Sequence, residues 1–65
     1  MNITINGKPE TIEPCSIERL VHQKGLNSES LVVELNMQII KQDQWPQTQL
    51  NDGDTLELLS FVGGG

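Results

Sequence analysis

Residues 2–25 read NITINGKPETIEPCSIERLVHQKG, and they contain the signals of a β-hairpin followed by a helix. In the first part of this stretch Ile3 and Ile5 alternate with polar residues, a period-two pattern that predicts a half-buried strand. The Asn-Gly pair at 6–7 is the strongest short signal for a hairpin turn. A second short strand with β-branched residues is predicted at 9–13, so residues 2–13 are expected to form a β-hairpin.

The second part of this stretch carries the signals of a short helix over 16–24. Ser16 is a favourable N-cap, because its hydroxyl can accept from a backbone N–H one turn later. Gly25 is expected to end the helix in the left-handed conformation. One face carries apolar residues at i, i+3, i+4 spacing: Ile17, Leu20 and Val21. The helix therefore has one apolar face that can pack on a sheet.

Three more strands are predicted beyond the helix. Residues 31–36 are mostly apolar, and 39–41 are short enough to form an edge strand. Pro46 is expected to prevent regular structure in the polar segment 42–49. The last and longest strand, at 55–62, runs directly into three glycines.

The expected order is β-β-α-β-β-β, an α+β arrangement with one helix packed across one face of a mixed sheet of four to five strands. This order resembles the ubiquitin-like β-grasp, in which two strands precede the helix and a long strand ends the domain. The prediction places the β-grasp domain at 1–62 and a flexible glycine tail at 63–65. A chain of 65 residues has room for one such domain.

The last strand is predicted to have two different faces. Leu56 and Leu58 would face the helix, which leaves Leu59 and Phe61 on the opposite face. Large apolar side chains exposed next to each other indicate a partner-docking patch, with Val62 as a third candidate. The alternative is a local bulge that turns one of these side chains inward.

Composition limits the possible functions. Nine acidic against four basic residues give a net charge of −5, which argues against a nucleic-acid partner and favours partners with basic docking surfaces. Acidity that serves only solubility is the alternative. No apolar run approaches the roughly 20 residues that span a bilayer, so a soluble, cytoplasmic protein without membrane partners is expected.

Single residues offer little catalytic chemistry. Cys15 is the only cysteine and His22 the only histidine, so neither an intramolecular disulfide nor a metal site is expected. We interpret Cys15 as structural or incidental and His22 as solvated. Trp45 is expected to cover part of the core, with a partner contact as the alternative.

The glycines Gly63, Gly64 and Gly65 suggest a function of their own. Without side chains they cannot contribute to a core, but such a segment can thread a narrow channel in another enzyme. The terminal carboxylate would then be the reactive group. Because oxide is a poor leaving group, this carboxylate would need adenylation by ATP before a sulfur nucleophile could attack. The alternative is a frayed terminus without function.

The whole sequence resembles the ThiS family, the sulfur carriers of thiamin thiazole synthesis within the ubiquitin-like, MoaD-like superfamily. Besides the length and the N-terminal hairpin, the matching features are Val33-Glu34-Leu35-Asn36, Ile39-Ile40, Trp45, Leu50-Asn51-Asp52-Gly53-Asp54, the strand Leu56 to Val62 and the final Gly64-Gly65. The Gly-Gly end is shared by β-grasp carriers in general. The spacing of Asn36, Ile39 and Trp45 and the Asp52-Gly53-Asp54 turn are moderately specific to this family.

This resemblance implies a carrier with no catalytic residues and no bound cofactor. An E1-like, ThiF-like adenylyltransferase would activate the carboxyl of Gly65 with ATP. Sulfur from a cysteine desulfurase would convert it to a thiocarboxylate, and a ThiG-like thiazole synthase would receive that sulfur. Gly63 and Gly64 would be the flexible lead to the reactive group.

Two other functions stay open at this point. The first is the small subunit of molybdopterin synthase, which is also a β-grasp thiocarboxylate carrier. The second is a ubiquitin-like modifier or interaction module, whose glycine tail forms an isopeptide bond or has no chemical role.

Overall fold

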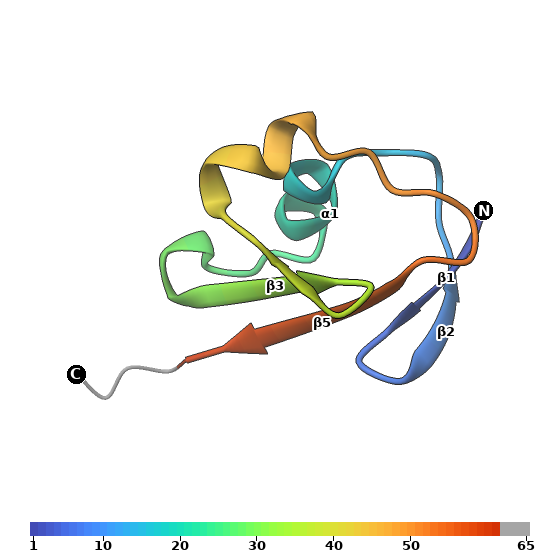
Figure 1. The fold of residues 1–65 in the computed structure, drawn as a ribbon, viewed down its shortest axis with the longest axis horizontal. Coiled ribbons are helices and arrows are strands. Elements are labelled where there is room, and N and C mark those ends of the chain that lie inside the picture. The colour runs from blue at the N-terminus through green and yellow to red at the C-terminus, as the bar shows by residue number, and fades with distance from the viewer. Residues whose placement is uncertain (62–65) are drawn as a thin grey trace.

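The computed structural model describes residues 1–61 (Figure 1). Within this range the chain forms five strands, one α-helix and two 3-10 helices. Their bounds are β1 Asn2–Ile5, β2 Lys8–Thr11, α1 Ile17–Gln23, η1 Ser28–Ser30, β3 Leu31–Leu35, β4 Gln38–Ile40, η2 Gln42–Gln47 and β5 Thr55–Ser60. The predicted order of strands and helix is confirmed. Val62 and the glycines at 63–65 lie outside the described residues.

The five strands form one mixed sheet in the order β2-β1-β5-β3-β4. β1 and β5 are parallel neighbours, whereas β1 with β2, β3 with β5, and β3 with β4 are antiparallel. Figure 1 shows α1 and η2 on the same side of this sheet. The predicted α+β class with one helix across a mixed sheet is confirmed, and β4 is an edge strand as expected.

The N-terminal hairpin turns at the predicted Asn-Gly pair. Asn6 and Gly7 have φ values of 51° and 80°, which is the geometry of a type I′ turn. The second strand begins and ends earlier than the predicted 9–13, at Lys8–Thr11. Two backbone hydrogen bonds between Met1 and Ile12 close the open end of the hairpin, at 2.8 and 2.9 Å.

The helix α1 begins and ends where its capping residues predict. The Ser16 hydroxyl accepts from the Arg19 backbone N–H at 3.1 Å, and Gly25 follows with a φ of 68°. The Gly25 N–H donates to the His22 carbonyl at 3.0 Å, which satisfies one of the last helical acceptors. In residues 1–61 no helix has both the length and the apolar character needed to cross a membrane.

The core lies between the sheet and the layer formed by α1 and η2. Its buried residues are Ile3, Ile5, Ile17, Leu20, Val21, Leu31, Val33, Trp45, Leu50, Leu56 and Leu58. Trp45 is a full member of the core, and its Nε1 donates to the Ile40 carbonyl at 2.9 Å.

The expectation that Pro46 prevents regular structure in 42–49 is wrong. Pro46 lies inside the 3-10 helix η2, Gln42–Gln47. Proline fixes φ near −65°, which suits a 3-10 helix, and the short helix tolerates the missing N–H. This helix is what turns the Trp45 ring toward the core.

Candidate functional site

The last strand has the two faces that alternation predicts. Leu56 and Leu58 are 0% and 7% exposed, whereas Leu59 and Phe61 are 42% and 58% exposed. The β3·β5 register runs without interruption from Leu35↔Leu56 to Leu31↔Ser60, so no bulge turns a side chain inward. The predicted exposure of Leu59 and Phe61 is confirmed, and their docking role stays a prediction. Val62, the third docking candidate, lies outside the described residues.

Strand pairing places further side chains beside these two. Val32 is opposite Leu59, Glu34 is opposite Glu57, and Ile39 of β4 is opposite Glu34. Directly paired residues point to the same side of a sheet. We call the part of this side that is formed by β3, β4 and the chain from Glu57 to Phe61 the outer face; its members are Val32, Glu34, Ile39, Glu57, Leu59 and Phe61.

Sequence reasoning missed the contribution of β3 and β4 to the outer face. Alternation along 31–35 does place Val32 and Glu34 opposite to the buried Val33. However, alternation within one strand does not say which residue of a distant strand lies beside it. Ile39, 67% exposed, joins the outer face only because β4 pairs with β3 in this register.

The end of β5 is held to its neighbours on both sides. On the β1 side, the Asn6 side chain bonds both backbone polar groups of Leu58. On the β3 side, the Phe61 N–H donates to the Ser30 carbonyl at 2.7 Å. The chain is therefore fixed to the sheet as far as Phe61, immediately before the segment that leads to the glycines.

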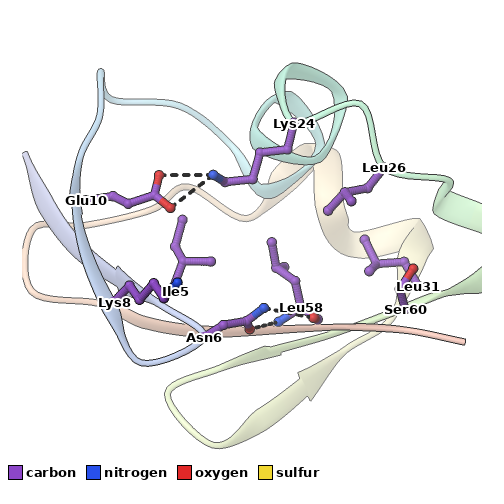
Figure 2. Close-up of a pocket in the computed structure, with 9 residues that line it drawn as sticks. All are labelled: Ile5, Asn6, Lys8, Glu10, Lys24, Leu26, Leu31, Leu58 and Ser60. Carbon is purple, nitrogen blue, oxygen red and sulfur yellow. Dashed lines mark hydrogen bonds and ion pairs between the residues drawn. The ribbon is translucent and has the colours of Figure 1, made fainter.

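A cavity of about 400 Å³ opens on the opposite side of the sheet, between the hairpin, α1 and β5 (Figure 2). Ile5, Leu26 and Leu58 form part of its apolar lining. Glu10 of β2 reaches Lys24 at the end of α1, with 3.0 Å between Lys24 Nζ and Glu10 Oε1. Neither Cys15 nor His22 lines this cavity, so it does not contain the thiol or the imidazole.

The exposure of His22 agrees with the sequence prediction. Cys15 is partly buried and packs against the core, whereas His22 is exposed. Among residues 1–61, no group of three or more His, Cys, Asp and Glu side chains is placed to hold a metal ion. What this part of the chain offers chemically is a mixed apolar and acidic surface beside an anchored terminal strand.

Comparisons with known proteins agree on one family. The model of the ThiS family matches residues 3–65. The chain is 35% identical over 66 residues to a thiazole synthase of Paramagnetospirillum magneticum, of which it spans only 20%. It is 34% identical over 50 residues to the sulfur carrier protein ThiS of Bacillus subtilis, with 77% of this chain and 76% of that protein covered.

A solved structure has the same fold. The crystal structure of a thiamine biosynthesis protein (ThiS) from Geobacter metallireducens aligns with a TM-score of 0.86 and 36% identity. The alignment covers 100% of both chains. The β-grasp arrangement expected from the order of elements is thereby confirmed.

Proposed function

Since this chain belongs to the ThiS family, we propose that it is a sulfur carrier protein of thiamin biosynthesis and is not itself an enzyme. The observation that carries this proposal is the family match over residues 3–65, which includes both the folded domain and the glycines. The chain is a co-substrate on which partner enzymes act.

The proposed site of sulfur attachment is the terminal carboxylate of Gly65. A carboxylate oxygen attacks the α-phosphorus of ATP, and pyrophosphate leaves, so that the carboxyl becomes an acyl adenylate. A persulfide sulfur of a partner then displaces AMP. This forms a new S–C bond to the carbonyl of Gly65. A second thiol of the partner then cleaves the S–S bond that belonged to the persulfide, which leaves the thiocarboxylate on Gly65 and a disulfide on the partner. ATP is used by the partner adenylyltransferase, and the carrier supplies no bound cofactor.

The folded domain has the task of bringing this carboxylate to its partners. The proposed docking residues are Leu59, Phe61 and Val62. The exposure of Leu59 and Phe61 at the end of β5 supports this role. A partner that contacts the outer face there is only a few residues from Gly65. The glycines Gly63 and Gly64 can enter a narrow channel because they have no side chains.

Three partners follow from this chemistry. A ThiG-like thiazole synthase as sulfur acceptor is supported by the Paramagnetospirillum relative, a thiazole synthase that contains a span matching the whole of this chain. The other two proposed partners are a ThiF-like adenylyltransferase, which activates the carboxylate with ATP, and a cysteine desulfurase, which is the source of sulfur. A cytoplasmic location belongs to the same proposal, because thiols and thiocarboxylates persist in a reducing compartment.

Intact-mass spectrometry tests the proposal. The chain is incubated with ATP, the E1-like adenylyltransferase, a cysteine desulfurase and cysteine. A mass gain equal to one oxygen-for-sulfur exchange supports a carrier. Conjugation to lysines of other proteins indicates a ubiquitin-like modifier instead, and an unchanged mass in a system that loads a known carrier contradicts both functions.

A further inference from the structure

Two carboxylates of like charge lie directly opposite each other in the middle of the outer face. Glu34 of β3 and Glu57 of β5 are register partners, and each is partly buried. The Cβ atoms of such a pair are roughly 4.5–5.5 Å apart, and like charges in this position destabilise a sheet. In the isolated domain the carboxylates of Glu34 and Glu57 therefore repel each other, although many other side chains could occupy these two positions.

No ion pair within residues 1–61 includes Glu34 or Glu57. The single ion pair within residues 1–61 joins Lys24 to Glu10. Figure 2 shows both of these side chains, together with Lys8, at the cavity on the helix side of the sheet. Neither Glu34 nor Glu57 accepts a side-chain hydrogen bond from any group in residues 1–61. The two carboxylates thus rely on water.

Apolar side chains lie beside the acidic pair in two directions. Along the strands, Val32 and Leu59 form the neighbouring pair on one side, and Ile39 lies across β3 from Glu57. A protein that covers Leu59 and Ile39 also removes water from the two carboxylates. Burying unpaired carboxylates is strongly unfavourable, so a partner that covers this face must supply a cation at the same place.

We propose that the outer face docks on thiazole synthase through an arginine of that enzyme, which lies between Glu34 and Glu57 while apolar side chains cover Leu59 and Ile39. Arginine fits because its planar guanidinium presents five donors and can bond two carboxylates at once. This inference rests on the proposed function, which makes thiazole synthase the sulfur acceptor. It adds which kind of partner surface can bind. An apolar surface without a cation would bury Glu34 and Glu57 unpaired, so it would bind the outer face poorly.

The test compares stability and binding in the same variants. Glu34→Gln, Glu57→Gln and the charge reversal Glu34→Lys each remove the repulsion, and Glu13→Gln is the matched control in an exposed loop. The outer-face variants should raise Tm by about 1–8 °C. They should weaken binding to thiazole synthase roughly tenfold or more at low salt, and the loss should shrink as salt rises. The control should change neither property.

Opposite results overturn the inference. If the outer-face variants bind thiazole synthase as tightly as the unaltered chain, no cation meets the acidic pair. If they bind weakly but are also less stable, Glu34 and Glu57 have a structural role instead. The proposed carrier function is tested by a different measurement. If that function is wrong, the unaltered chain will not show the oxygen-for-sulfur mass gain, whatever the binding experiments give.

Discussion

The side chain of Asn6 bonds both backbone polar groups of Leu58, although the two residues are 52 positions apart in the sequence. Asn6 Oδ1 accepts from the Leu58 N–H at 2.7 Å, and Asn6 Nδ2 donates to the Leu58 carbonyl at 3.2 Å. The parallel register of β1 and β5 ends at Ile5↔Leu56. The amide of Asn6 therefore continues the pairing by one more step toward the end of β5.

Replacing Asn6 tests this anchor. Asn6→Gly tolerates the φ of 51° but loses both bonds, and we expect it to lower the free energy of unfolding by about 1–2 kcal/mol. Asn6→Ala should cost about 1–2 kcal/mol more, because a non-glycine residue without a local hydrogen bond is strained there. Urea unfolding measures both. A glycine variant as stable as the unaltered chain would show that the anchor contributes nothing.

The exposed apolar residues should matter for transfer rather than for folding. Leu59→Ser and Phe61→Ser should change the free energy of unfolding by less than about 1 kcal/mol. Each should lower the rate of sulfur transfer at subsaturating thiazole synthase by roughly tenfold, as expected for central interface residues. Met37→Ser is the matched control, since Met37 is 92% exposed in the β3–β4 turn and outside the outer face. If Leu59→Ser and Phe61→Ser transfer sulfur as fast as Met37→Ser does, Leu59 and Phe61 have no docking role.

The start of β5 depends on a buried acid. Asp54 is 8% exposed, and its two oxygens accept from Asn36 Nδ2 at 3.0 Å and from the Asn51 N–H at 2.7 Å. Asp54→Asn replaces one acceptor by a donor that faces another donor, so it should cost about 1–3 kcal/mol of unfolding free energy, nearly as much as Asp54→Ala. Thermal unfolding compares the two. An asparagine variant that matches the unaltered chain would mean that the carboxylate is not required.

Removing Gly64 and Gly65 separates domain from reactive group. The shortened chain should keep its unfolding free energy within about 0.5 kcal/mol, because glycines without side chains add no buried area. It should gain no sulfur in the complete loading system, as measured by intact mass. If the shortened chain unfolds, the predicted boundary between a domain at 1–62 and a tail at 63–65 is wrong.

Local signals in the sequence account for most of the fold. The Asn-Gly pair sets the hairpin turn, and Ser16 and Gly25 set the ends of α1, because each acts on the backbone within one turn. The 3-10 helix around Pro46 was not predictable in the same way. Its conformation is fixed by burial of Trp45 against the core and by the bond to Ile40, and these are contacts that a local pattern does not contain.

The candidate site was predictable only in part, for a related reason. The exposure of Leu59 and Phe61 follows from alternation within β5, once one face is assigned to the helix. The opposition of Glu34 and Glu57, and the presence of Ile39 beside them, depend on how three separate strands pair. A shift of one residue in that register would reverse the faces, so these neighbours could be found only from the folded arrangement.

The most direct test of the carrier function follows one sulfur atom. The chain is loaded with isotopically labelled sulfur, freed of ATP and of the loading enzymes, and mixed with thiazole synthase and its other substrates in a single turnover. We predict that the thiazole contains the label, that the amount of labelled product equals the amount of thiocarboxylate consumed, and that the chain returns to its original mass. Label that stays on the chain would contradict a role in thiazole synthesis. So would label that never enters the thiazole but is transferred to the substrate of molybdopterin synthase when its large subunit and substrate replace thiazole synthase.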